Sequence, residues 1–241
     1  MSKLKTILLK FAGPLQSWGT DSHFETRHTD YYPSKSAVIG LLAAAAGYSR
    51  SDDEKISKFN DFGFAVRIDQ QGNLLKDFHV AQKYKADGSF ERNYVTNRYY
   101  IEDAVYVVAV SGADSEIEGI YACLKKPCFQ LFMGRRSLPV TADFLLGIFD
   151  DDLMNTLEKY PWQAAQWYRL RNYDSRELYL DVYVDSNKTE AIGWKLLRRD
   201  YVYSFSQKER SFGLRSETHY RVKVINTDYQ PTAEHDIFSF I

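Results

Sequence analysis

Residues 3–47 read KLKTILLKFAGPLQSWGTDSHFETRHTDYYPSKSAVIGLLAAAAG, and this stretch contains the signals of a strand, a loop and a helix. The segment 3–11 is almost wholly apolar at its centre, which predicts a strand in the middle of a sheet. After a loop rich in Gly, Pro, Ser and Trp, Ser34 has the side chain of a helix N-cap, and Gly47 is a typical helix stop. The apolar residues between them recur at the spacing of an amphipathic helix, so a helix that packs on a sheet is expected.

The same patterning extends the prediction along the chain. Three further strands are predicted at 62–68, 104–110 and 128–133, with a second helix at 114–125. The stretch 73–99 is polar, aromatic and basic, with Asp87-Gly88 as a hairpin turn signal, and we interpret it as a projecting hairpin. This order of elements predicts an α+β fold, a ferredoxin-like sandwich similar to RNA-recognition domains with an inserted β-hairpin.

The C-terminal third has a different pattern. Apolar and polar residues alternate over 178–185 and again over 219–224, which predicts half-buried strands. We therefore divide the chain into a ferredoxin-like domain at 1–147, with its hairpin at about 73–100, and a linker with a smaller β-rich domain at 148–241.

Charge is segregated along the chain, although the net charge is only −1. Between Glu118 and Asp143 there are four basic residues and no acid, and residues 195–223 contain eight basic residues against three acids. Residues 143–158 contain five acids and no base. This asymmetry fits a basic face for an anionic ligand, although a basic loop can also be no more than a solvated surface.

Other features narrow the class of protein. No apolar run reaches the roughly 20 residues of a membrane-spanning helix, and the N-terminus lacks the apolar core of a signal peptide. Two cysteines give no disulfide framework, so a cytoplasmic protein without membrane association is expected. The cysteine spacing has no matching Cys or His pair, and Asp150–Asp152 fit a solvated loop better than a magnesium site, so no metal or other cofactor is expected.

Four motifs together resemble one family. In chain order they are FAGPLQSWG at 11–19, ETR at 25–27, PSKS at 33–36 running into GLLAA at 40–44, and GRRS at 134–137. They resemble the CasD family, the single-copy backbone subunits of type I-E CRISPR surveillance complexes (Cascade) in the RAMP superfamily. The similarity spans about residues 4–147 and is weaker through 199–220.

The resemblance implies a non-catalytic, RNA-binding subunit of a ribonucleoprotein complex in antiviral defence. Its hairpin would act as a thumb that grips the 5′ handle of the CRISPR RNA. The subunit would cap one end of the backbone filament, beside the repeated backbone subunit and the large subunit. The positions expected to contact RNA are Gln16, Trp18, Arg27, Ser34, Lys35, Ser36, His79, Lys83, Arg92, Arg98, Tyr99, Arg135, Arg136 and Ser137.

The chemistry of these residues leaves alternatives open. Residues 34–36 lie at a helix N-terminus, which favours a phosphate but is equally the place of an ordinary cap. Trp18 can stack on a base or fill the core, and Arg27 can contact a phosphate or form a surface salt bridge. Arg98 beside Tyr99 combines a planar cation with a stacking surface, which is how single-stranded RNA bases are held.

An enzyme is the main alternative. Some RAMP proteins cut RNA without a metal ion, and a metal-independent endoribonuclease would need an acid and a base near the 2′-hydroxyl. The candidates are His28, His79, Lys83 and Tyr84, and of these His79 fits a structural or RNA-contacting role better than a catalytic one. A protein-only scaffold without RNA affinity is the third reading.

Overall fold

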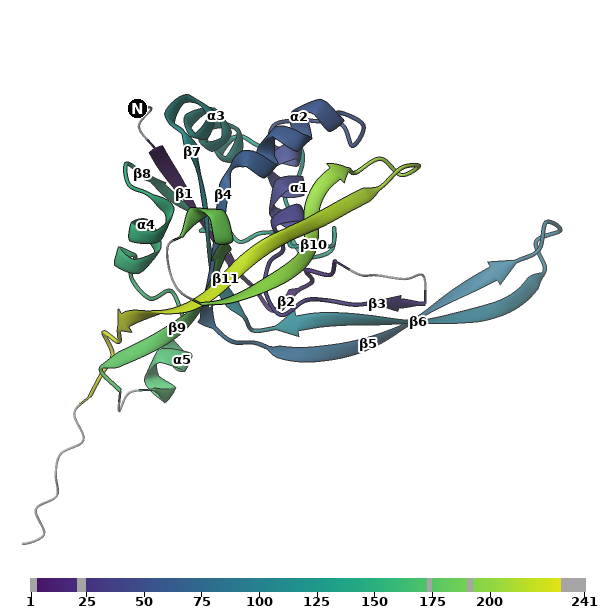
Figure 1. Ribbon diagram of the computed structural model, residues 1–241. Helices are drawn as coiled ribbons and strands as arrows, with labels where there is room; N and C mark the ends of the chain where they lie inside the picture. Colours follow the sequence, from purple (N-terminus) through teal and green to yellow (C-terminus); the bar gives the residue numbers. More distant parts are fainter. Residues whose placement is uncertain (1–3, 21–24, 173–174, 190–192, 231–241) are drawn as a thin grey trace, which may run out of the picture.

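A seven-stranded antiparallel sheet forms the centre of the molecule (Figure 1). The computed structural model describes residues 4–20, 25–172, 175–189 and 193–230, so Lys3 of the first predicted strand lies outside the described residues. The strand order is β10 (Trp194–Ser204), β11 (Ser211–Ile225), β9 (Glu177–Asp185), β4 (Gly63–Gln70), β7 (Val105–Ala113), β1 (Leu4–Ala12) and β8 (Leu145–Phe149).

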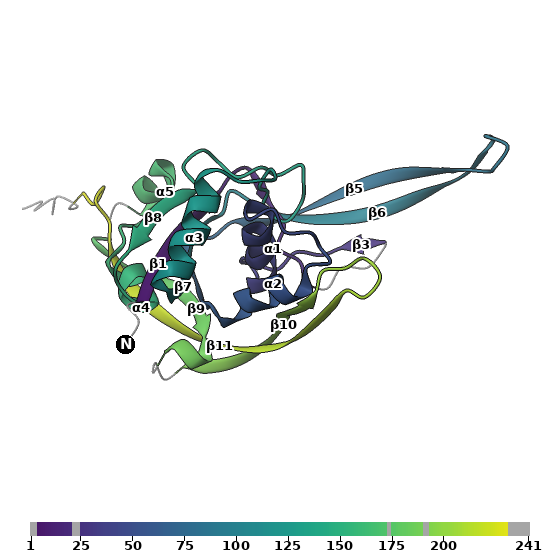
Figure 2. The same cartoon turned by 90° about the horizontal axis from the view of Figure 1, so that it is seen from above.

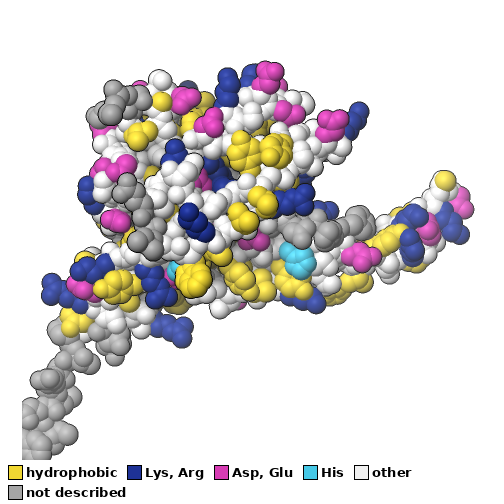
Figure 3. Space-filling view, in the orientation of Figure 1, with side chains coloured by type: hydrophobic (Ala, Val, Ile, Leu, Met, Phe, Trp, Pro, Cys, Tyr) yellow, Lys and Arg dark blue, Asp and Glu magenta, His cyan; other side chains and the backbone are white. Residues whose placement is uncertain are grey.

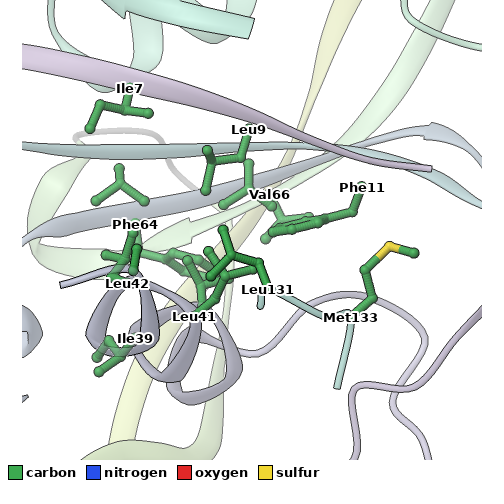
Figure 4. Close-up of a cluster of buried hydrophobic side chains, with 14 of the residues drawn as sticks. Ile7, Leu9, Phe11, Ile39, Leu41, Leu42, Phe64, Val66, Leu131 and Met133 are labelled. Carbon is green, nitrogen blue, oxygen red and sulfur yellow. The ribbon is translucent and has the colours of Figure 1, made fainter. Parts of the chain in front are cut away.

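Both faces of the central strands are covered, because their side chains alternate between two cores. Ile7, Leu9 and Phe11 of β1 point toward the helix α1 (Lys35–Ala45), as Figure 4 shows, and belong to the larger core cluster. Leu8 points the other way, into the cluster that includes Leu153 of α4 (Leu153–Lys159). The prediction of a fully buried central strand is confirmed, since all four side chains are 0% exposed.

The two predicted helices are present. Helix α1 begins after Ser34, whose hydroxyl accepts a hydrogen bond from the backbone N–H of Ala37, and the chain leaves the helix through Gly47 at a φ of 76°. Helix α3 spans Asp114–Lys125, as predicted. Shorter helices that the sequence did not indicate are α4, α2 (Asp53–Ser57), η1 (Lys58–Asp61), α5 (Gln166–Arg171) and η2 (Ser186–Lys188). None of the helices described is both long enough and apolar enough to cross a membrane.

A second, smaller sheet is built around a long hairpin that projects from the body (Figures 1 and 2). The hairpin consists of β5 (Asn73–Tyr84) and β6 (Phe90–Glu102), and Gly88 in its turn has a φ of 81°. Two short strands flank the root of β6: β2 (Leu15–Gln16) pairs antiparallel with it and β3 (Thr26–Arg27) pairs parallel. The stretch interpreted from sequence as a projecting hairpin thus forms this ribbon.

The strand predicted at 128–133 is wrong. Leu131 and Met133 are buried as the apolar pattern indicated, but the segment has only an isolated bridge from Phe132 to Pro139 and packs across the end of α1. The backbone N–H of Cys128 donates to the carbonyl of Ala45 there, which removes it from a sheet ladder. The edge position beside β1 is occupied instead by β8, in a stretch for which the sequence predicted no strand.

Strand pairing crosses the predicted domain boundary at residue 147. Val182 and Val184 of β9 pair with β4, so strands from both predicted domains lie in one continuous sheet. Sheet continuity does not test whether 148–241 folds by itself, so the division into two domains stays a prediction. Residues 231–241 of that second unit lie outside the described residues.

Candidate nucleic-acid interface

The projecting hairpin has a basic face. Directly paired residues of an antiparallel ladder share a face, and successive residues alternate. The register pairs Asp77 with Arg98, His79 with Thr96, and Lys83 with Arg92. Four residues predicted to bind RNA therefore share this face: His79, Lys83, Arg92 and Arg98. The hairpin presents them as a row that runs from its root toward its tip.

The opposite face of the hairpin is apolar and open to solvent. Its exposed apolar side chains are 43–65% exposed, and they are Leu74, Phe78, Val80, Tyr84, Phe90 and Val95. Lys76 and Tyr99 also lie on this face. Figure 3 shows hydrophobic and basic side chains next to each other along this projection. A contiguous exposed apolar stripe is typical of an interaction surface, so the two faces of one ribbon suit two different kinds of partner.

Three arginines from separate parts of the chain meet at the root of the hairpin. The parallel pairing of β3 with β6 places Arg27 opposite Arg98. Arg135 reaches the same place from the GRRS loop: its Nη2 donates to the carbonyls of Arg27 (3.1 Å) and Tyr99 (3.0 Å). Its guanidinium lies 4.1 Å from the ring centroid of Tyr100, a cation–π contact that fixes its plane.

Two of these guanidinium groups have unused donors. Among the described residues, Nε of Arg98 and Nη1 of Arg135 are buried atoms without a hydrogen-bond partner. Buried polar groups are almost always paired, so unpaired donors on permanently charged side chains call for an acceptor from outside. Arginine forks match the oxygens of a phosphate well, and the root of the hairpin can therefore bind an oxyanion.

The GRRS loop is held in place by close packing against the loop 13–19. Gly134 has a φ of 84°, and a Cβ atom added there would lie 1.5 Å from the carbonyl oxygen of Ser17. The backbone N–H of Ser17 in turn donates to the carbonyl of Met133 at 3.3 Å. Only glycine fits this contact, which leaves Arg136 and Ser137 exposed beside the arginine cluster.

Gln16 and Trp18, expected to contact RNA, are inside the protein. Gln16 is 0% exposed, and its amide donates to the carbonyls of Ala104 (2.8 Å) and Phe11 (3.3 Å). Its oxygen accepts from the indole N–H of Trp18, which is 1% exposed and packs on Phe11 with ring centroids 5.0 Å apart. The structure corrects the expectation that Gln16 and Trp18 contact RNA. Both side chains are buried in the core, where they stabilise the loop beside the interface.

The helix N-terminus at residues 34–36 is also already occupied. The carboxylate of Asp200 accepts a hydrogen bond from the backbone N–H of Lys35 (2.8 Å), in the place predicted for a phosphate. Lys35 is 4% exposed, and its ammonium donates to Asp185 (2.9 Å) and to the carbonyls of Asn60 and Phe62 (2.7 Å each). Burial lowers the pKa of Lys35, against the raising effect of Asp185.

Ser34 and Ser36 share this buried setting. Their hydroxyl oxygens lie 3.3 Å apart, and Ser34 caps the helix. The prediction that residues 34–36 contact RNA is therefore corrected to the ordinary capped helix, with a carboxylate of the same chain as the anion. No local sequence signal could reveal this, since Asp185 and Asp200 lie 150 and 165 residues further along the chain.

The candidates for acid–base catalysis are divided between surfaces. His79 and Lys83 lie on the basic face of the hairpin, whereas Tyr84 lies on the apolar face, where its hydroxyl donates to Gln82. His28 stacks on Tyr99 at the root, with ring centroids 5.4 Å apart. Residues 4–20, 25–172, 175–189 and 193–230 contain no cluster of three or more His, Cys, Asp or Glu side chains able to hold a metal ion.

Tyr100, the ring under Arg135, was not among the residues predicted from sequence to contact RNA. A signal was available, because alternation along β6 places Tyr100 on the same side as Arg98.

The acidic run at residues 150–152 has a structural role. Asp152 caps α4 by accepting hydrogen bonds from the backbone N–H groups of Met154 and Asn155, and Asp151 forms an ion pair with Lys159.

Three comparisons with known proteins all find similarity to CRISPR-associated proteins. The family model described as CRISPR-associated protein (Cas_Cas5) matches residues 6–216. The CRISPR system Cascade subunit CasD of Escherichia coli (strain K12) is 31% identical over 157 residues, which cover 58% of this chain and 70% of the relative.

Solved structures show the same likeness. One from a CRISPR RNA-guided surveillance complex has a TM-score of 0.77 at 28% identity, covering 95% of each chain. A crystal structure of a Cas protein has a TM-score of 0.62 at 28% identity, covering 94% of this chain and 98% of that one.

Proposed function

The chain belongs to the Cas_Cas5 family of CRISPR-associated proteins, and from this premise we propose that it is the CasD-type RNA-binding subunit of a type I-E CRISPR surveillance complex. It grips the 5′ handle of the CRISPR RNA and caps the backbone filament in antiviral defence. It acts by binding and does not cut RNA.

One observation carries this proposal: the convergence of Arg27, Arg98 and Arg135 at the root of the hairpin. Two of the three have buried donors without a partner among the described residues. A backbone phosphate of the handle satisfies both donors. The row of basic residues along the hairpin extends the path of the RNA from there, with Arg136 and Ser137 at its side.

We further infer that the body is a ferredoxin-like RAMP domain and that the β5–β6 hairpin is its thumb. The order β4-β7-β1-β8, with α1 after β1 and α3 after β7, supports the first inference. The position of the hairpin between β4 and β7 supports the second. Residues 148–241 then form the smaller C-terminal unit, joined to the domain through the pairing of β9 with β4.

The partners are the CRISPR RNA, the repeated backbone subunit and the large subunit. The apolar face of the hairpin supports protein partners beside the RNA, because most of its exposed side chains are apolar and Lys76 is the one charged residue that the described register places there. A ribbon with one basic and one apolar face can hold RNA against a neighbouring subunit.

The exposed end of the basic loop gives a test of phosphate contact. Replacing Arg135 and Arg136 together with alanine is expected to weaken handle-RNA binding and to flatten the slope of log K against log salt by about one to two, since each phosphate contact contributes about 0.7 on a single strand. Fluorescence anisotropy at several salt concentrations measures the slope. Replacing Lys125 and Lys126 with alanine removes the same charge from the end of α3 and should leave the slope unchanged. An equal change of slope in both double variants would mean that these residues act only through the general positive charge of the surface.

Arg98 is expected to need its guanidinium and not only its charge. Its buried Nε has no counterpart in lysine, so Arg98→Lys should bind handle RNA nearly as poorly as Arg98→Ala, with a loss of about 1–3 kcal/mol. The measurement is affinity at fixed salt. Lys76→Ala is the control, because Lys76 lies on the opposite face of the same hairpin. Wild-type affinity in Arg98→Lys would show that Arg98 contributes only its positive charge and that its guanidinium geometry is not needed.

The endoribonuclease alternative has its own test. Purified protein is expected to leave repeat RNA intact in buffer containing EDTA, and His79→Ala should not alter RNA processing by the assembled system. Gel analysis of labelled repeat RNA measures both. Cleavage at one site by the wild-type protein, abolished in His79→Ala, would establish the enzyme instead.

A further inference from the structure

A concave surface lies between the loop at residues 29–32 and strand β10. It has a volume of about 330 Å³ and is lined by Thr29, Asp30, Tyr31, Tyr32, Leu196, Leu197, Arg198 and Glu217. Its rim is apolar: Tyr31 is 65% exposed and Leu197 is 73% exposed. A groove of this size accommodates a few side chains of a bound segment.

The charges within the groove are paired internally. Asp30 accepts from Arg198 at 2.8 Å, and Glu217 accepts from the hydroxyl of Tyr32 at 2.5 Å. Glu217 also pairs with the buried guanidinium of Arg215. The lining thus contains two carboxylates and one guanidinium, a balance that disfavours a phosphate and favours an uncharged occupant.

One polar group in the lining has an unused donor. The side chain of Arg198 is 10% exposed, with its guanidinium 4.3 Å from the ring centroid of Tyr32. Its Nη2 donates to Asp30 and to the carbonyl of Tyr32, but its Nη1 is buried without a partner among the described residues. An acceptor oxygen without further negative charge, such as a peptide carbonyl, would give this donor a partner.

The groove adjoins a free sheet edge. Among the strands that the structure describes, β10 pairs only with β11. Asn60 closes the far part of this edge, since its side chain bonds both the N–H (3.0 Å) and the carbonyl (2.8 Å) of Val202. Within the described part of the chain, no side chain bonds the backbone of residues 194–199 in this way, and Trp194 is 83% exposed. Natural edge strands are usually protected, so an open apolar edge marks a place for another strand.

We propose that this edge and groove bind an extended, apolar segment of a protein partner, which adds to β10 as a further strand. One of its side chains lies between Tyr31 and Leu197, and one of its carbonyls accepts from Nη1 of Arg198. Lys195 and Arg199 are exposed on the same strand, so the segment carries carboxylates on its flanks. The inference rests on the proposed function, because the partner is a protein subunit of the RNA-bound complex.

Hydrogen–deuterium exchange on three samples tests the proposal: the purified subunit, the subunit with handle RNA, and the complete complex. The backbone amides of 194–199 are expected to exchange at least tenfold more slowly only in the complete complex. Protection by RNA alone would make the groove a nucleic-acid site and overturn the proposal. Equal exchange in all three samples would also overturn it.

A pair of substitutions identifies the surface. Leu197→Glu is expected to release one protein subunit from the purified complex while the isolated subunit keeps its affinity for handle RNA. Tyr179→Glu is the control, because Tyr179 is 63% exposed on β9 and does not line the groove. An intact complex with Leu197→Glu would overturn the proposal. Absence of RNA binding in the wild-type subunit would instead count against the proposed function.

Discussion

Replacing Lys35 with alanine is expected to lower the free energy of unfolding by about 2–6 kcal/mol, because two buried carbonyls lose their donor and each unsatisfied buried group costs about 1–3 kcal/mol. The substitution leaves the carboxylate of Asp185 with Arg215 as its cationic partner. It also leaves the carbonyls of Asn60 and Phe62 without the ammonium that now donates to both. Urea denaturation followed by fluorescence measures the change.

The control for this prediction is an exposed lysine on the neighbouring short helix η1. Lys58→Ala should change the free energy of unfolding by no more than about 0.5 kcal/mol, as surface substitutions usually do. The salt dependence of RNA binding should be unchanged in both variants. A stable Lys35→Ala protein with a flattened salt slope would restore Lys35 as an RNA contact.

Gly134→Ala is expected to destabilise the protein by about 2–5 kcal/mol and to lower its affinity for handle RNA at least tenfold. A positive φ costs an alanine about 1–2 kcal/mol, and overpacking adds about 1–3 kcal/mol. The added Cβ would lie 1.5 Å from the carbonyl oxygen of Ser17, so the loop must move away. That movement takes Arg135 off the ring of Tyr100 and dismantles the arginine cluster.

Gly88 provides a matched control for the backbone effect. It also has a positive φ, 81°, but a Cβ added there would meet nothing within 4 Å. Gly88→Ala should therefore cost only about 1–2 kcal/mol and leave RNA affinity intact. Denaturant titrations and RNA-binding curves of the two variants separate the effects. Equal losses in both would show that the contact with Ser17 contributes nothing.

Secondary structure was predictable where one pattern had one physical meaning. The stripe of α1 and the run of α3 both fit helix periodicity, and the apolar centre of β1 could only be buried on both faces. The segment 128–133 shows the limit. Its apolar residues are buried, but burial does not distinguish a ladder from a chain that crosses the end of a helix.

The candidate site was predictable in part, for a related reason. An arginine beside tyrosines pointed to Arg98, and a basic loop without acids pointed to Arg135; the structure reveals the unused donors of both. The phosphate expected at residues 34–36 was indistinguishable from a carboxylate by any local pattern, because a helix N-terminus attracts either. Long-range partners such as Asp200 decide between them, and only the folded chain brings these partners together.

The two-faced hairpin restricts how its length can change. Side chains alternate with a period of two, so one residue gained or lost in a strand exchanges its basic and apolar faces beyond that point. Arg92 and Lys83 would then point where Val95 and Phe78 now point, toward the wrong partner. Viable relatives are therefore expected to lengthen or shorten this ribbon by even numbers of residues in each strand, or to absorb an odd residue in a bulge, such as the register shift between Lys83 and Tyr84.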